Sequence, residues 1–190
     1  DMKGEKNIFK DIIYPVLILA AVCFVITLLL VLTNRLTKDR ITLNAIDLEA
    51  AGELLDFDKE KVKVNQLSDI AYELTENDEV KGYIFISESS GYGGPVKVMT
   101  GLKADGSVSG VKILENSETP GLGGKIQDES FLRQFINDTF IEQFVVVKNE
   151  KQNDNEIQAI TGATRSSNAV TDAVNKSINE YKRLIGGGQG

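Results

Sequence analysis

Histidine and tryptophan are absent from the sequence, and Cys23 is its only cysteine. Histidine is the commonest metal ligand and the usual general base near neutral pH, so its absence argues against a zinc site. A single cysteine excludes an internal disulfide, a paired-cysteine redox motif and a cysteine-ligated iron–sulfur cluster within the chain. The sequence therefore predicts no metal site and no catalytic side chain, and any redox chemistry requires an organic cofactor.

Basic residues are also few. The chain has 21 Lys and Arg residues against 28 Asp and Glu residues, for a net charge of -7. Such a chain repels phosphate backbones and gains nothing from the release of counterions, so we expect no nucleic-acid partner. A length of 190 residues with 42% hydrophobic content suits one membrane anchor and one folded domain.

Charged residues are missing from one long stretch, residues 12–32. Its length matches the roughly 20 apolar residues that a helix needs to cross a bilayer. We expect a transmembrane helix there, preceded by a short N-terminal segment at 1–11. A cleaved signal peptide fits less well, because the run exceeds a usual signal core and no small-residue cleavage site follows it. Basic residues flank both sides, so charge alone leaves the orientation open.

The rest of the chain predicts an α+β domain. Near-helical apolar spacing at 33–57 indicates an amphipathic connecting helix. Three segments rich in Val, Ile and Tyr, separated by glycine-containing turns, indicate an antiparallel meander. These segments are 80–87, 96–102 and 108–114. A short helix at 128–137 and a buried strand at 144–148 are expected to follow.

A final helix is the clearest element. Ser166 or Ser167 is its expected N-cap, and the glycines from Gly186 end it, leaving a flexible tail at 186–190. One apolar stripe runs along it, made of Val170, Val174, Ile178, Tyr181 and Ile185. The predicted folded domain therefore spans residues 58–185.

The segment Ala159–Ser167 leads from the end of a predicted strand into this helix. Backbone N–H groups and the helix dipole favour an anion at such a position, and Arg165 adds a guanidinium. Taken alone, the segment is either a phosphate site or an ordinary strand-to-helix turn.

Thr161-Gly162-Ala163-Thr164 resembles the S/T-G-A-T flavinylation motif of the FMN-binding domain family. The resemblance implies that a flavin transferase, with FAD as donor, joins FMN to the Thr164 hydroxyl as a phosphoester. Thr161, Gly162 and Ala163 would line the phosphate end. The family usually carries an aspartate where this chain has Gln158, which puts the efficiency of modification in question.

Glu118-Thr119-Pro120-Gly121-Leu122-Gly123 is similar to the segment that lies beside the flavin ring in the same family. Alone it would read as an ordinary Pro-Gly turn. The resemblance implies that part of this segment contacts FMN, namely Glu118, Thr119, Gly121, Leu122 and Gly123. The turn at 91–95 also resembles the glycine-rich turn that follows the first strand of these domains.

Both motifs lie behind one N-terminal anchor, and the size of the chain most resembles that of the G subunit of the Rnf complex, a ferredoxin:NAD⁺ oxidoreductase that translocates Na⁺ or H⁺. The resemblance implies an N-terminal transmembrane helix followed by an antiparallel-sheet FMN-binding domain with flanking helices. It further implies a covalent-FMN electron carrier that contacts other subunits of a membrane-bound redox complex. In a bacterial or archaeal cell membrane, its N-terminus would be cytoplasmic and its FMN domain extracytoplasmic.

Two alternatives stay open at the level of sequence. The C subunit of the Na⁺-translocating NADH:quinone reductase shares both motifs and the single anchor, but is typically longer. A membrane-tethered binding module without cofactor would use Thr164 and the glycines only for caps and turns. Direct hydride exchange with NADH is not expected, because no G-x-G-x-x-G segment joins a strand to a helix.

Overall fold

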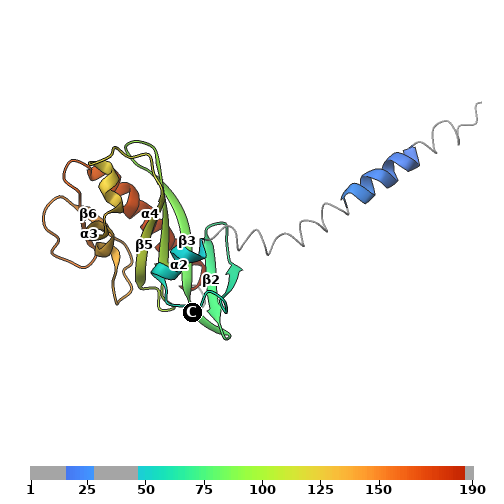
Figure 1. Ribbon diagram of the computed structural model, residues 1–190, viewed down its shortest axis with the longest axis horizontal. Helices are drawn as coiled ribbons and strands as arrows, with labels where there is room; N and C mark the ends of the chain where they lie inside the picture. The colour runs from blue at the N-terminus through green and yellow to red at the C-terminus, as the bar shows by residue number, and fades with distance from the viewer. Residues whose placement is uncertain (1–15, 28–46, 187–190) are drawn as a thin grey trace, which may run out of the picture. The chain divides into compact units, whose positions relative to one another are not determined.

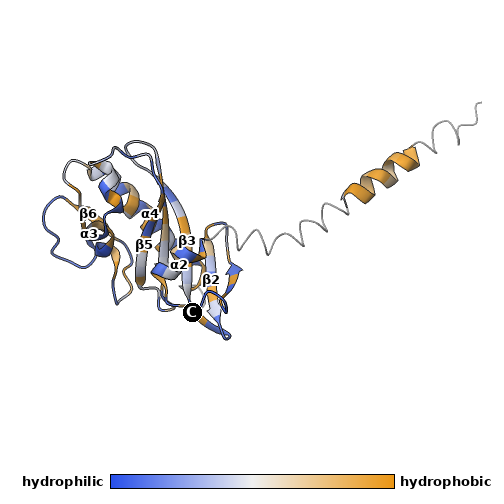
Figure 2. Ribbon diagram, viewed as in Figure 1, coloured by the Kyte–Doolittle hydropathy of each residue, from blue (hydrophilic) through white to orange (hydrophobic). Residues whose placement is uncertain are grey.

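The structure is a computed structural model that describes residues 16–27 and 47–186. The chain divides into two units, Asp1–Ala45 and Ile46–Gly190. In the first unit, residues 16–27 form a helix that is apolar along its length (Figure 2). Within the two described ranges, no helix is both long and hydrophobic enough to span a bilayer. The predicted segment at 1–11, the remainder of 12–32 and residues 187–190 lie outside the described residues.

A five-stranded antiparallel sheet forms the centre of the second unit, with its strands in sequence order (Figure 1). The strands are β1 (Lys63–Gln66), β2 (Ala71–Glu76), β3 (Glu79–Ser90), β4 (Pro95–Leu102) and β5 (Val108–Glu115). The predicted meander is confirmed as β3, β4 and β5. The sequence analysis did not identify β1 and β2, which add two strands at one edge.

Helices cover both faces of this sheet. The short helix α2 (Leu48–Leu54) packs on β4 and β5, and the long helix α4 (Thr164–Leu184) packs on β3 and β4. Asp47 caps α2, since its carboxylate accepts hydrogen bonds from the N–H groups of Glu49 and Ala50. Of the connecting helix expected at 33–57, the described part is this two-turn helix, and residues 33–46 lie outside the described residues.

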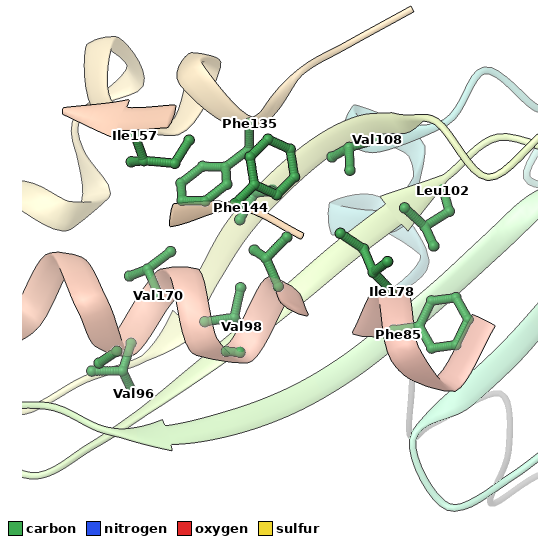
Figure 3. Close-up of a cluster of buried hydrophobic side chains, with 14 of the residues drawn as sticks. Phe85, Val96, Val98, Leu102, Val108, Phe135, Phe144, Ile157, Val170 and Ile178 are labelled. Carbon is green, nitrogen blue, oxygen red and sulfur yellow. The ribbon is translucent and has the colours of Figure 1, made fainter. Parts of the chain in front are cut away.

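The larger hydrophobic core lies between the sheet and α4 (Figure 3). Fully buried Phe85, Val98 and Ile178 belong to it, and so do Phe135 and Phe144, whose rings meet edge to face with centroids 5.4 Å apart. A second core, around Leu74, Ile84 and Met99, fills the opposite face under α2. Because successive side chains of a strand point to opposite faces of the sheet, the strands contribute residues to both cores.

Three short helical segments follow β5, and the last two of them lie within the helix expected at 128–137. They are the 3-10 helix η2 (Gly123–Gln127), the helix α3 (Glu129–Leu132) and the 3-10 helix η3 (Arg133–Phe135). Asp128 is extended, with ψ 133°, and separates η2 from α3. Phe131 and Phe135 are buried as expected. The expected helix is shorter than predicted, spans residues 129–135 and becomes a 3-10 helix from Arg133.

A small parallel sheet completes the domain. β6 (Val145–Val147) pairs with β7 (Glu156–Gln158), which the sequence analysis placed only loosely before the final turn. The Asn175 side chain on α4 accepts from the Phe144 N–H at 2.8 Å and donates to the Phe144 carbonyl oxygen at 2.9 Å. These two bonds fix the small sheet against the helix.

The start of α4 differs from the prediction. Its N-cap is Ala163, and Ser166 and Ser167 lie buried in its first turn. The Ser167 hydroxyl accepts from the Ile160 N–H and donates to the Ala163 carbonyl oxygen, each at 3.0 Å. This serine therefore ties the preceding turn to the helix instead of capping it. The predicted stripe is confirmed from Val170 to Tyr181, whose members are buried.

Candidate functional site

Both sequence motifs and the 91–95 turn meet at one cavity of about 380 Å³. The turn lies between β3 and β4, the 118–123 loop follows β5, and the third wall is the start of α4. The lining residues are Tyr92, Glu118, Thr119, Leu122, Gly123, Gly162, Ala163, Arg165 and Ser166. The volume lies within the range of small-molecule sites in proteins.

The N-terminus of α4 forms one wall of this cavity. Gly162 has φ 79°, a left-handed conformation that favours glycine, and Ala163 follows as an N-cap that makes no side-chain hydrogen bond to the helix. The N–H groups of the first turn are therefore left without a side-chain cap. They carry the positive end of the dipole of a helix of 21 residues, which favours an anion there.

The Glu118 carboxylate connects all three walls. One oxygen accepts from the N–H groups of Tyr92 at 2.7 Å and Gly93 at 3.2 Å, and the other accepts from the Ser166 hydroxyl at 2.7 Å. The side chain is only 7% exposed. A buried carboxylate is tolerated when it accepts several hydrogen bonds, and these bonds join the loop, the turn and the helix.

Arg165 makes a second connection across the cavity. Its Nε–H donates to the Gly91 carbonyl oxygen at 3.0 Å, which joins the first turn of α4 to the 91–95 turn. The turn itself is closed by a hydrogen bond of 2.8 Å from the Gly91 N–H to the Gly94 carbonyl oxygen. Hydrogen bonds thus hold the turn at Gly91, its first residue, and through Glu118 at Tyr92 and Gly93.

Close packing explains the glycines of this region. A β-carbon at Gly93 would overlap the Ser117 carbonyl oxygen, and one at Gly91 or Gly123 would overlap a carboxylate oxygen of Glu118. These approaches require the absence of a side chain.

Some of the predicted site residues line the cavity, and the others lie at neighbouring positions. Glu118, Thr119, Leu122, Gly123, Gly162 and Ala163 line the cavity. Thr164 is the half-buried first residue of α4 directly beside it, and Thr161 and Gly121 are exposed at neighbouring positions. Gln158, at the end of β7, has an exposed side chain.

Tyr92, Arg165 and Ser166 also line the cavity. The resemblance named none of them as FMN contacts, but the residues alone placed the Arg165 guanidinium and the Ser166 hydroxyl at the expected anion site. Tyr92 lies in the glycine-rich turn, and Arg165 directly follows the T-G-A-T segment. Ser166 was expected as an N-cap, and its hydroxyl instead donates to the Glu118 carboxylate.

The residues present fit a flavin nucleotide. The uncapped helix start suits a phosphate, while Leu122 and Tyr92 offer apolar surface that is 46% and 74% exposed. A helix start together with apolar side chains in one cavity matches a ligand that has both a phosphate and an aromatic ring system.

Two families match parts of the chain. Residues 91–179 match the FMN-binding domain, and residues 2–50 match the RnfG N-terminal region. The first match contains every residue that lines the cavity.

Relatives of known name extend this similarity. The chain is 40% identical, over 80% of its length and 75% of the relative, to the G subunit of a Na⁺-translocating ferredoxin:NAD⁺ oxidoreductase complex of Acetobacterium woodii. It is 37% identical, over 66% of each chain, to the G subunit of a proton-translocating ferredoxin:NAD⁺ oxidoreductase complex of Clostridium ljungdahlii.

A solved structure shows the same fold. The C subunit of the Na⁺-translocating NADH-quinone reductase of Parabacteroides distasonis superposes with a TM-score of 0.51. The match covers 60% of this chain and 61% of that one, at 21% identity. At this identity the comparison shows the fold alone.

Proposed function

The chain belongs to the family of G subunits of ion-translocating ferredoxin:NAD⁺ oxidoreductase complexes, and on this premise we propose that it is a membrane-anchored electron carrier with FMN bonded to Thr164. Relatives in this family serve complexes named for Na⁺ or for proton translocation. This chain would pass electrons between redox centres of such a complex while the complex moves ions.

One observation carries the proposal for the cofactor. Two motifs far apart in the sequence form the walls of one cavity, and Thr164 is the first helical residue at its edge. A hydroxyl at this position lies next to the uncapped N–H groups that would hold a phosphate. The attachment residue and the phosphate site would thus be built by the same turn of α4.

The covalent step transfers FMN from FAD. The Thr164 oxygen forms a bond to the phosphorus of the FMN half, the pyrophosphate bond of FAD breaks, and AMP leaves. The hydroxyl proton is released, so the chain gains one FMN less water. A flavin transferase would supply this reaction: the chain has no histidine, and the Glu118 carboxylate in the cavity is engaged in hydrogen bonds that join its walls.

The residues around the cavity hold and orient the cofactor. The first turn of α4 and Arg165 would bind the phosphate, and the 118–123 loop would present backbone groups and Leu122 to the ring. Bound FMN supplies transfer of one or two electrons, which the side chains of this chain do not supply. Glu118 keeps the three walls together through three hydrogen bonds.

The membrane anchor is the second part of the proposal. The uncharged stretch at 12–32 has the length of a transmembrane helix, and residues 16–27 within it are helical and apolar. We place the FMN domain on the extracytoplasmic side and the N-terminus in the cytoplasm. The anchor would keep the cofactor within electron-transfer distance of the other subunits.

Intact mass of the full chain, produced together with a flavin transferase, tests the attachment. We expect a gain of one FMN less water in the native chain and in Thr164→Ser, which keeps the hydroxyl. Thr164→Val should lose the gain completely. The same replacement at the exposed Thr139, outside the cavity, should keep it.

Other results of this experiment would contradict the proposed attachment. A native chain that stays unmodified would contradict covalent attachment and direct attention to Gln158, where the family usually has aspartate. If the chain also fails to bind free FMN, the cofactor-free binding module becomes the better account. Modification that persists in Thr164→Val would place the attachment at another hydroxyl.

A further inference from the structure

Tyr92 differs from the other tyrosines of the described residues. Its side chain is 74% exposed, whereas Tyr72, Tyr83 and Tyr181 are each 5–8% exposed. A single exposed aromatic residue is not unusual on a protein surface. Tyr92, however, lines the cavity in which Leu122 and the start of α4 meet.

The backbone of Tyr92 is held firmly while its ring is not covered. Its N–H donates to Glu118 at 2.7 Å, and the preceding Gly91 carbonyl oxygen accepts from Arg165 at 3.0 Å. Gly93 on the other side packs against Ser117 so closely that no side chain fits. Three contacts thus fix the position from which the phenol ring projects.

Such an arrangement is suited to a planar aromatic ligand. Rigid placement of the backbone lowers the entropy lost when the ring packs on a partner. Aromatic rings gain about 0.5–1.5 kcal/mol from stacked or edge contacts beyond the burial of area. The chain has no tryptophan, and Tyr92 is the one aromatic side chain that lines this cavity.

We propose that the Tyr92 phenol is the aromatic wall of the flavin pocket and packs directly on the isoalloxazine ring of bound FMN. This inference rests on the proposed function, since it requires FMN in this cavity. It assigns to Tyr92 a contact that the two recognised motifs do not contain. Leu122 lines the same cavity and would supply an aliphatic contact.

The fluorescence lifetime of the bound flavin is the first test. A phenol in contact with an excited flavin donates an electron that then returns, so it quenches emission without net reaction. The phenyl ring of phenylalanine does not donate an electron, so Tyr92→Phe should keep the packing and lengthen the lifetime severalfold. Tyr92→Leu should lengthen the lifetime as well. Tyr83→Phe, the same change at a buried tyrosine outside the cavity, should leave the lifetime unchanged.

Nitration of tyrosine is the second test and does not depend on emission. In a Tyr14→Phe background, which removes the tyrosine outside the described residues, tetranitromethane should modify Tyr92 in the unloaded chain. FMN loading should slow this reaction severalfold. Peptide masses identify the modified residue.

The outcomes separate this inference from the proposed function. If intact mass shows no attached FMN, the covalent claim fails, and nitration is repeated with saturating free FMN. Protection by free FMN would still support the contact with Tyr92. Equal nitration with and without FMN, or equal lifetimes in the native chain and Tyr92→Phe, would overturn it.

Discussion

At the scale of single residues, the Glu118 carboxylate joins the three walls of the cavity that it lines. Both of its oxygens accept hydrogen bonds from the protein. The carboxylate is buried, so its negative charge depends on those donors. Glu118 therefore positions the walls of the cavity.

This role predicts unequal effects of two substitutions. Glu118→Ala removes the acceptor of three hydrogen bonds and should lower the free energy of unfolding by about 1–3 kcal/mol. Glu118→Gln keeps one oxygen for the Tyr92 and Gly93 N–H groups, and its amide can donate to the Ser166 hydroxyl, so it should cost less. Urea unfolding of the unloaded chain in detergent measures both.

A matched control exists at Glu115. Its carboxylate is exposed and lies 3.2 Å from Lys97, a geometry that contributes little in solution. Glu115→Ala should change stability by less than about 0.5 kcal/mol. Equal losses of stability in the Glu118 and Glu115 variants would show that the hydrogen bonds between the walls do not stabilise the fold.

At the scale of elements, the helices and strands that could be predicted from the residues alone are those with a strongly periodic pattern of apolar residues. The strands β3, β4 and β5 are long and rich in β-branched residues, and α4 has an unbroken apolar stripe. Both signals are local, because the residue types repeat with the period of the element.

The elements that were missed depend on tertiary partners. β1 consists of Lys63–Gln66, mostly exposed and polar, and is a strand because β2 pairs with it. The turn between β2 and β3 uses Asn77 and Asp78, both with positive φ, in place of the glycine that signals such a hairpin.

The start of α4 and the cavity lacked a local signal for other reasons. A left-handed Gly162 followed by Ala163 begins the helix without a capping side chain, while two serines downstream resemble caps. The cavity joins residues 92, 118 and 165, whose proximity follows from the Glu118 and Arg165 hydrogen bonds. Resemblance, not spacing, brought the two motifs together at the level of sequence.

The C-terminal end of α4 offers a prediction on pH. Arg183 donates two hydrogen bonds to Glu180, and these, with a further hydrogen bond from Ser68, lower the pKa of Glu180 to about 2. A carboxylate with a lowered pKa in the folded state stabilises the fold above the unfolded pKa of 4.5. That stabilisation is lost as the pH falls from about 4.5 toward about 2.

Glu180→Gln should therefore destabilise the chain modestly at pH 7, by less than about 1 kcal/mol, since the partner Arg183 is exposed. The difference in the free energy of unfolding between this variant and the native chain should shrink as the pH falls below 4. Urea unfolding at several pH values measures it. Glu142→Gln, in an exposed pair with Lys182, serves as the control. A difference that does not vary with pH would contradict the assignment.

At the scale of the whole molecule, the two units have separable tasks. Both hydrophobic cores and every residue that lines the cavity lie in the unit Ile46–Gly190. The apolar helix at 16–27 lies in the other unit, and the matched families divide the chain in a similar way. Family membership confirms the prediction of a G subunit.

We therefore expect a chain that begins at Ile46 to fold cooperatively and stay in the supernatant after centrifugation. The full chain should stay with the membrane pellet after alkaline carbonate extraction. Within it, Val22→Lys places a charge near the centre of the proposed span, at a cost of about 2.5–3.5 kcal/mol, and should release part of the chain, whereas Val22→Leu should not. Full release of the native chain would contradict the anchor, and a fragment without a cooperative unfolding transition would contradict the independence of the domain.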